Sequence, residues 1–463
     1  MDVILPLDIT TVFKKYIKKR RKCYCNYFVG SELHGLKEAI STSASLHHIT
    51  WGLLIFLAMC LAIWNTIQMC QDYLANQVET SYSRHFVSRL EFPSVIICPK
   101  SPDALNFTSI KREILNVIPN MTDHDVVDLI MYAIADSALV NGQSVTLNQP
   151  EEHFGAFDEK INIWKGRRNQ TEFYTDLFEK NGYTCNQLFK QCRYGSRTIN
   201  CCDIFESYYV MLRGRCFRMK QFYQYDPGFY GQLYIGMNEL PSLTTVSQKQ
   251  VQLVAFMATP GSEISTFPRY YLNNQSETQI SIKLRMFDLD PEFSKCHNDV
   301  EARGRAACYV RQWLYDKFVD PHNCTPFYMA YRAHGAPVCE TGLIARMYEN
   351  VLNLTTEENI CMVACSRSER EYKTTYRMNS APKALGFVET DAYRLIVHYD
   401  DLEYENFKEV RIVTLPGFVS QIGGQLGLFL GVTVMSITQI LLNLYLFITE
   451  KVKWLAKKIW KPK

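Results

Sequence analysis

Residues 412–449 read IVTLPGFVSQIGGQLGLFLGVTVMSITQILLNLYLFIT and contain no Asp, Glu, Lys or Arg. As one straight helix this block would extend about 57 Å at ~1.5 Å per residue, whereas a hydrocarbon core ~30 Å thick needs about 20 apolar residues. The first part of the block is rich in Gly, Ser and Gln, and only the later part has the composition of a lipid-facing helix. The block therefore predicts a membrane-spanning segment that is not one continuous helix.

A second uncharged block lies near the other end of the chain. Residues 49–70 read ITWGLLIFLAMCLAIWNTIQMC, with Trp51 and Trp64 near the two ends, where aromatic side chains favour the membrane interface. The alternative is a cleaved signal peptide, which normally occupies the first 15–30 residues. Because 48 residues precede this block, a transmembrane helix is the better interpretation.

The charges outside these blocks predict how the chain is oriented. With +3 on the whole chain, +4 on residues 1–49 and +5 on residues 450–463, the stretch 71–411 carries −6. Lys/Arg clusters flank both spans on their terminal sides, which by the positive-inside rule places both termini in the cytoplasm. Beside a membrane, such basic runs favour contact with lipid headgroups over nucleic-acid binding. We expect a multi-pass protein of the plasma membrane.

The stretch between the spans has the features of an extracellular region. All six N-x-S/T sequons lie there, at Asn106, Asn120, Asn169, Asn274, Asn323 and Asn353. Twelve of the sixteen cysteines lie there as well, and an even number in an oxidising compartment indicates disulfides. A zinc site is disfavoured because no CxxC pair or Cys/His quartet has ligand spacing. Cys23, Cys25, Cys60 and Cys70 are interpreted as free thiols.

The extracellular region itself has an α+β pattern. Strands are expected at 92–98, 251–257, 279–287 and 393–399, where β-branched or aromatic residues lie between turn formers. Helical patterns occur around 122–139 and 300–319. No catalytic motif such as G-x-S-x-G or H-E-x-x-H is present, and the histidines are scattered. We therefore expect neither an enzyme nor a cofactor or metal site.

Small residues recur along the second span. Gly423, Gly427 and Gly431 are spaced by four, and Ser420, Gly424 and Thr438 fall on the same face. Such a face allows two helix backbones to approach closely, or it can line a water-filled path in which carbonyl oxygens coordinate ions. Either role requires several subunits, because one such helix cannot enclose a path.

Four segments of the chain match one family in the same order. They are SELHG at 31–35, FPSVIICP at 92–99, CMVACSRSEREY at 361–372 and GGQLGLFLGVT at 423–433. Together with the topology they resemble the degenerin, epithelial sodium channel and acid-sensing channel superfamily. The resemblance implies a trimer whose ectodomain is built like a hand, with palm, knuckle, finger, thumb and β-ball. It also implies a cation pore that prefers Na⁺ and is blocked by amiloride.

The resemblance assigns roles to individual residues. Gly431, Val432 and Thr433 match the narrow selectivity belt, and Ser420, Gln421, Gly424, Gly427 and Gln439 match pore-lining positions around it. His34 and Gly35 match a cytoplasmic motif that tunes gating. Tyr73 and Phe293 match an aromatic contact between the first span and the ectodomain. The implied disulfides are Cys98–Cys216, Cys192–Cys202, Cys185–Cys201, Cys296–Cys365, Cys308–Cys361 and Cys324–Cys339, with the choice between Cys201 and Cys202 left open.

The chain departs from the family pattern at several pore positions. Thr433 stands where Ser is usual, and Gln421, Gln439 and Asn443 stand where acidic residues are common. Rings of acidic side chains concentrate cations, so their absence favours a second interpretation, an accessory subunit that conducts only with related subunits. The stimulus is left open between protons, peptides, mechanical force and constitutive opening.

These observations give five segments and a ranked set of functions. We expect a cytoplasmic segment at 1–48, a span at 49–70, an ectodomain at 71–411, a pre-pore segment and pore helix at 412–449 and a basic tail at 450–463. The first hypothesis is a pore-forming subunit for Na⁺ and other monovalent cations, as a homotrimer or a heterotrimer. The alternatives are the accessory subunit and a two-pass receptor or adhesion protein without a pore. ATP-gated trimers share the topology but lack the His-Gly segment and the glycine-rich run.

Overall fold

The computed structural model describes residues 45–75, 77–134, 151–260, 268–297, 305–333, 335–347, 350–351, 353, 361–378 and 391–459. The predicted motif residues His34 and Gly35 lie outside this part of the chain. Two compact units are present, one formed by both ends of the chain and one by Thr80–Glu409. We describe each unit separately.

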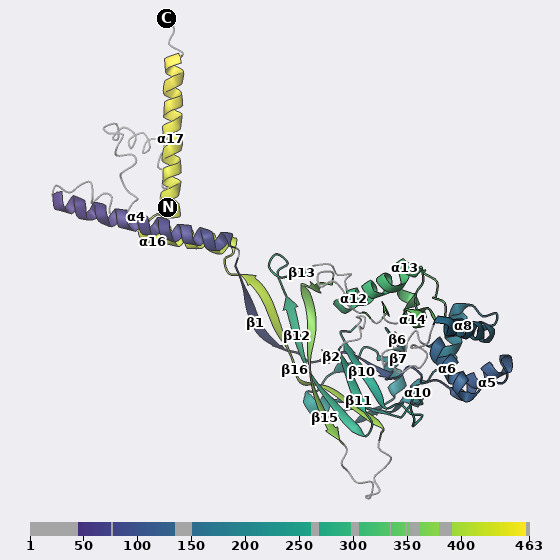
Figure 1. Cartoon of the computed structure of the whole chain (residues 1–463). Helices are drawn as coiled ribbons and strands as arrows, with labels where there is room; N and C mark the ends of the chain where they lie inside the picture. Colours follow the sequence, from purple (N-terminus) through teal and green to yellow (C-terminus); the bar gives the residue numbers. More distant parts are fainter. Residues whose placement is uncertain are drawn as a thin grey trace, which may run out of the picture. The chain divides into compact units, whose positions relative to one another are not determined.

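The described residues of the terminal unit form three helices. They are α4 (Ser45–Leu74), α16 (Leu415–Leu430) and α17 (Val434–Ile459). Helices α4 and α16 lie side by side, and α17 turns away from α16 (Figure 1). Within α4, Ile49–Leu74 is long and apolar enough to cross a membrane, and the other described helices do not meet that test. The first predicted span is thus part of a single helix that is a candidate membrane span, whereas the second span remains a prediction.

The larger unit contains a seven-stranded sheet. Its strand order is β15-β12-β16-β9-β4-β5, with β1 paired to β16. The bounds are β1 (Val78–Phe86), β4 (Phe189–Tyr194), β5 (Arg197–Ile199), β9 (Leu233–Met237), β12 (Ser276–Asp288), β15 (Ser366–Met378) and β16 (Tyr393–Arg411). Along most of β12 buried residues alternate with half-buried ones, as the period of two in a strand requires. β12 runs antiparallel to β15 and parallel to β16.

The same unit contains a second sheet of five strands, with the order β11-β10-β3-β7-β6. The bounds are β3 (Ser94–Pro99), β6 (Phe205–Val210), β7 (Gly214–Met219), β10 (Gln252–Ala258) and β11 (Arg269–Asn273). Every residue of β3 is buried, because this strand lies between β10 and β7. Short pairs also form between β2 (Leu90–Glu91) and β8 (Tyr223–Gln224), and between β13 (Cys296–His297) and β14 (Val363–Ala364). The four predicted strands are confirmed, and β16 is much longer than expected.

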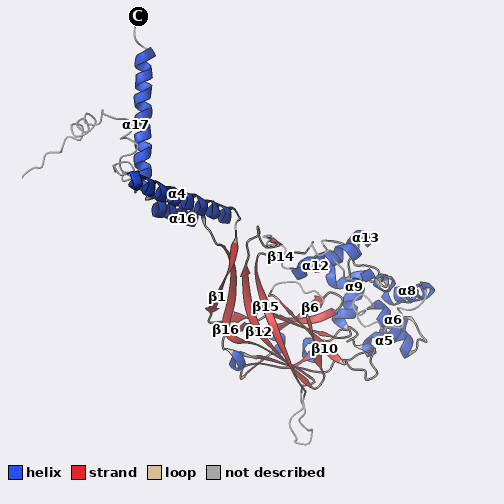
Figure 2. Cartoon of the chain, turned by 60° about the vertical axis from the view of Figure 1, so that its left-hand side comes forward, coloured by secondary structure: helices blue, strands red, loops and turns tan. Residues whose placement is uncertain are grey.

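Helices form one end of the larger unit, away from the long strands β1, β12 and β16 (Figure 2). They are α5 (Phe107–Val117), α6 (Asp123–Ala133), α8 (Glu151–Lys165), α9 (Gln170–Thr175), η3 (Asp176–Lys180), α12 (Arg305–Leu314), η5 (Tyr315–Val319), α13 (Asp320–His322), η6 (Phe327–Arg332) and α14 (Leu343–Arg346). Their buried faces share one apolar core that includes Tyr132, Trp313 and Phe318. The two predicted helical regions are confirmed over α6 and over α12 with η5, whereas residues 135–139 and 300–304 lie outside the described residues, and the α+β class is confirmed.

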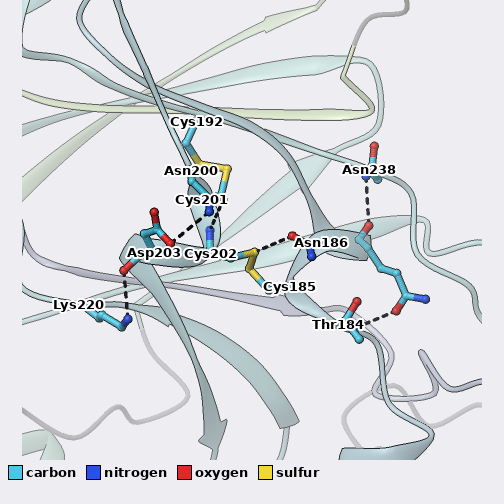
Figure 3. The surroundings of a disulfide bond; sticks show 11 residues. Thr184, Cys185, Asn186, Cys192, Asn200, Cys201, Cys202, Asp203, Lys220 and Asn238 are labelled. Carbon is cyan, nitrogen blue, oxygen red and sulfur yellow. Dashed lines mark hydrogen bonds between the residues drawn. A yellow bond between two sulfur atoms is a disulfide. The ribbon is translucent and has the colours of Figure 1, made fainter.

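Six disulfides stabilise the larger unit. Four have the predicted partners, namely Cys98–Cys216, Cys296–Cys365, Cys308–Cys361 and Cys324–Cys339. The predictions Cys192–Cys202 and Cys185–Cys201 were wrong, because the structure pairs Cys185 with Cys202 and Cys192 with Cys201 (Figure 3).

The short helix α11 (Cys201–Ile204) explains the exchanged partners. Adjacent residues of a helix point about 100° apart, so Cys201 and Cys202 face different neighbours. Cys201 is buried and reaches the buried Cys192 of β4. Cys202 points instead toward Cys185, the first residue of α10 (Cys185–Leu188).

Candidate ion-conduction site

The segment before the helix break presents small and polar residues without close neighbours in the single chain. Helix α16 begins at Thr414, whose side chain accepts a hydrogen bond from the backbone N–H of Gly417. No residue of α16 is buried. A Cβ added at Gly423 or Gly424 would meet no described atom within 4 Å. This face is therefore open to a lipid, to water or to another helix.

The helix ends at the first residue of the predicted belt. Gly431 has a φ of +67°, in the left-handed region that glycine adopts at low cost. Its N–H donates to the carbonyl of Gly427 at 3.0 Å, which is the usual glycine stop signal at a helix end. Helix α17 begins after Thr433, whose carbonyl accepts from the N–H of Ile437 at 3.1 Å. The predicted interruption of the uncharged block is confirmed and lies at residues 431–433.

The interruption changes which backbone carbonyl groups take part in helical hydrogen bonds. Among the backbone hydrogen bonds of the described residues, none ends on the carbonyl oxygen of Gly431 or Val432. The Val432 oxygen lies 3.8 Å from the position that a Cβ on Gly427 would occupy. A methyl group at position 427 would therefore make an ordinary van der Waals contact with this oxygen. Backbone carbonyls of this kind can replace the hydration shell of a monovalent cation when several subunits contribute them.

The remaining predicted pore residues are placed along the two helices. Ser420 and Gln421 are exposed on α16, before the break. Thr438 lies on α17 and donates its hydroxyl to the carbonyl of Val434 at 2.9 Å, so this hydroxyl is satisfied within its own helix. Gln439 lies on α17 as well, but its side chain is outside the described part of the chain. Residues 412–449 carry no acidic side chain.

The predicted aromatic pair falls in two different units. In the terminal unit, Tyr73 of α4 stacks on Phe418 of α16 with ring centroids 4.4 Å apart. Phe293 belongs to the larger unit and is 39% exposed. The contact of Tyr73 with Phe293 therefore stays a prediction. Sequence reasoning missed Phe418, although an aromatic residue in the first turns of α16 is a signal that could have indicated it.

An ion network that sequence reasoning also missed joins three strands of the seven-stranded sheet. Glu405 of β16 is 5% exposed and accepts hydrogen bonds from Tyr82 of β1, at 3.0 Å, and from Arg285 of β12, at 3.1 Å. Lys283 Nζ lies 2.5 Å from the same carboxylate. These partners, Lys283 first, lower the pKa of Glu405 to about 2. The carboxylate therefore holds β1, β12 and β16 together while it is ionised.

The six predicted glycosylation sites lie at the surface. All six asparagines are exposed: Asn106, Asn120, Asn169, Asn274, Asn323 and Asn353. Asn106 and Asn169 also cap helices, since their side-chain oxygens accept from backbone N–H groups of α5 and α9. Their exposure is compatible with glycan attachment, which stays a prediction.

Comparison with known proteins identifies the family. The family model described as amiloride-sensitive sodium channel matches residues 27–442, which is most of the chain. This chain belongs to the amiloride-sensitive sodium channel family. The match includes the glycine face, the helix break and the disulfide-rich region, so the family resemblance of the four motifs is confirmed. Members of this family are ion channels rather than enzymes.

Curated relatives align with this member of the amiloride-sensitive sodium channel family over 92% of its length. The mouse bile acid-sensitive ion channel is 18% identical, over 92% of this chain and 90% of its own. The zebrafish acid-sensing ion channel 4-B is 20% identical, over 92% of this chain and 76% of its own. A solved proton-activated chloride channel matches at 8% identity and a TM-score of 0.32, over 86% of this chain and 98% of its own, which is too distant to bear on fold or function.

Proposed function

We propose that this chain is a pore-forming subunit of a trimeric, Na⁺-permeable and amiloride-sensitive cation channel of the plasma membrane. The observation that carries the proposal is the break at residues 431–433, which interrupts the helix directly after a face of small residues. Three copies of this segment around one axis supply a ring of oxygens for a dehydrated cation. Both termini are cytoplasmic, and residues 412–449 form the second span with its interruption.

Gating in this proposal starts in the extracellular region. Strand β1 continues the chain after α4, and β16 continues into the segment that leads to α16. A change in the spacing of these strands moves the chain segments that enter the membrane. Glu405 sets that spacing within the sheet, and Tyr73 and Phe418 couple the two helices of the terminal unit. The cytoplasmic His34 and Gly35 modulate opening.

The test is whole-cell current in oocytes that express this chain alone. The recording includes Na⁺/K⁺ reversal potentials, amiloride, external pH steps in both directions and bile acids, since protons and bile acids are the agents named for the relatives. Gly431→Trp should abolish an inward cation current without loss of surface protein, because the indole occupies the belt and the left-handed φ disfavours a side chain. Leu428→Trp is the matched control, since Leu428 is 78% exposed on the same helix and should leave the current within about twofold.

A second candidate function is an accessory subunit that does not conduct alone. The observation that favours it is the uncharged pore segment, in which Gln421, Gln439 and Asn443 stand where acids are common in the family. Silence of the chain alone, with trimers at the surface, would support this candidate. Gln421→Asp with Gln439→Glu should then restore a current or raise the conductance. A current that Gly431→Trp leaves unchanged would contradict the proposed belt, because conduction would then not pass residue 431.

A further inference from the structure

A hollow of about 1270 Å³ lies in the larger unit, between the helical end and the loop that follows β9. One wall is a face of α6 that carries Asp128 and Met131, and a second wall is the start of α5. The third and fourth walls are residues 180–187 and residues 238–248. The volume exceeds the ~300–1,000 Å³ that is usual for small-molecule sites. None of the residues assigned to conduction or gating above lines it.

Hydrogen bonds hold the walls of the hollow in place. Asp103 is fully buried, and one of its carboxylate oxygens accepts from the backbone N–H groups of Leu243 and Thr244, each at 2.9 Å. Asn238 is bonded to the end of α10, since its backbone N–H donates to the carbonyl of Leu188 and its side-chain amide donates to the carbonyl of Gln187. The hollow is therefore preformed, as binding sites usually are.

The lining combines apolar surface with excess negative charge. Phe107, Val127, Met131 and Leu243 are half-buried and line the hollow. Three carboxylates also line it, from Asp123, Asp128 and Glu239, against one lysine, Lys180.

The three carboxylates differ in how they are neutralised. Asp123 pairs with Lys111, and Glu239 pairs with Lys249 and accepts a hydrogen bond from Asn274. The described partner of Asp128 is the ring of His124, at 3.0 Å, which is charged only when protonated. No Lys or Arg of the described ranges forms an ion pair with Asp128, whose side chain is 28% exposed. Asp128 is thus the carboxylate that can receive a cation from outside the protein.

We propose that this hollow is a binding site for an organic cation with an apolar body, whose charged group contacts Asp128 while the body packs against Val127, Met131 and Leu243. An anion of the same shape is disfavoured, because two further carboxylates line the walls. The proposal depends on the hollow alone and not on the pore, so it is tested by binding rather than by current.

The test measures binding of three compounds that share one apolar body and differ in charge. They are 4-phenylbutylamine, 4-phenylbutanol and 4-phenylbutyrate, titrated by calorimetry into the full chain in lipid nanodiscs. Asn106 and Thr108 line the hollow and form a sequon. The measurement therefore uses a Thr108→Ala background, which removes any glycan at the rim and keeps the Asn106 helix cap. We expect the amine to bind more tightly than the alcohol, and the alcohol more tightly than the carboxylate.

Two matched variants separate the proposal from general attraction of cations. Asp128→Asn should weaken binding of the amine by about fivefold, as for a partly exposed ion pair, and should leave binding of the alcohol unchanged. Asp123→Asn removes the same charge from the same hollow, but its effect should stay within about twofold, because Lys111 already neutralises Asp123. Met131→Trp should weaken binding of both compounds, because the larger indole occupies the place where the apolar body packs against Met131.

The thermal melting temperature of each variant checks that the fold is kept. Tighter binding of the carboxylate than of the amine would overturn the proposal. So would equal effects of Asp128→Asn and Asp123→Asn, or binding of the amine that Met131→Trp leaves unchanged.

Discussion

The terminal unit and the larger unit bury their residues to different degrees. In α16 no residue is buried, and α4 exposes apolar side chains such as Leu53, Leu57 and Trp64. In the larger unit every residue of β3 is buried, and six disulfides join its strands and helices. The larger unit is thus stabilised by contacts within one chain, whereas the helices of the terminal unit expose apolar and small residues, which we propose are covered by lipid and by neighbouring subunits. Substitutions should therefore act on folding in the larger unit and on conduction in the terminal unit.

The largest effect on folding is expected when Cys98 and Cys216 are both replaced by serine. This disulfide closes a separation of 118 residues and is fully buried, so its loss should lower the free energy of unfolding by about 5 kcal/mol. The measurement is the fraction of protein that reaches the cell surface, which should fall to background. Cys60→Ser is the matched control, because Cys60 is an exposed free thiol on α4. Unchanged surface expression of the double variant would contradict the comparison between the units.

The two exchanged disulfides provide a sharper test within the larger unit. Cys201→Ser should release the thiol of Cys192, and Cys202→Ser that of Cys185. Each loss should cost about 3 kcal/mol from loop closure, with a greater total for Cys201→Ser because its partner is fully buried. Thiol labelling followed by mass spectrometry identifies the released cysteine. A free thiol at Cys185 in the Cys201→Ser variant would contradict the observed pairing and support the predicted bridge between Cys185 and Cys201.

A smaller, pH-dependent effect is expected at Glu405. Glu405→Gln should lower the free energy of unfolding by about 1–2 kcal/mol near neutral pH, since charge-assisted hydrogen bonds are lost. The pKa of Glu405 is lowered to about 2 when folded, so its stabilisation is present above the unfolded pKa of about 4.3. That stabilisation is lost as the pH falls from there toward 2. Thermal melting of both proteins over this range should show their difference shrinking.

Glu409→Gln is the comparison for this variant, since Glu409 lies on the same strand and also accepts hydrogen bonds, from the Asp290 N–H and the Ser294 hydroxyl. No lysine or arginine of the described residues pairs with it. Its substitution should have the smaller effect. The melting temperatures of Glu405→Gln and of the parent chain should not differ by the same amount at every pH. Such a pH-independent difference would contradict the role assigned to the ionised carboxylate.

The smallest effect is expected from the ring pair of the terminal unit. In a double-mutant cycle of Tyr73→Ala and Phe418→Ala, the coupling should be about 0.5–1.5 kcal/mol, as for other stacked aromatic pairs. Thermal melting in nanodiscs measures it. A cycle of Tyr73→Ala with Phe229→Ala is the control, because Phe229 is 74% exposed and belongs to the larger unit. Coupling near zero in the first cycle would show that the stacked rings do not stabilise this unit.

Local patterns in the sequence were enough to predict the main elements. The first span follows from an uncharged run of sufficient length, and the strands follow from β-branched runs between turn formers. An interruption could also be predicted, because the uncharged block is too long for one span, and the family resemblance placed it at Gly431. Each of these features depends on residues that are close together along the chain.

Features that depend on contacts between residues far apart in the chain could not be predicted from such local patterns. The partners of Cys201 and Cys202 depend on how α11 is rotated against β4 and α10. The sequence alone does not distinguish two neighbouring cysteines as disulfide partners. The Glu405 network joins β1, β12 and β16, whose register is set by packing across the sheet.

The sequence by itself therefore determined the membrane topology we expect, the class of the extracellular fold and the need for an interruption in the second uncharged block, since hydrophobic length and strand period are local properties. Only the tertiary structure decided which cysteines pair, which strands one buried carboxylate joins, and that Asp128 faces a preformed hollow. The physical reason is that pairing, charge compensation and cavity shape depend on distances between residues far apart in the chain.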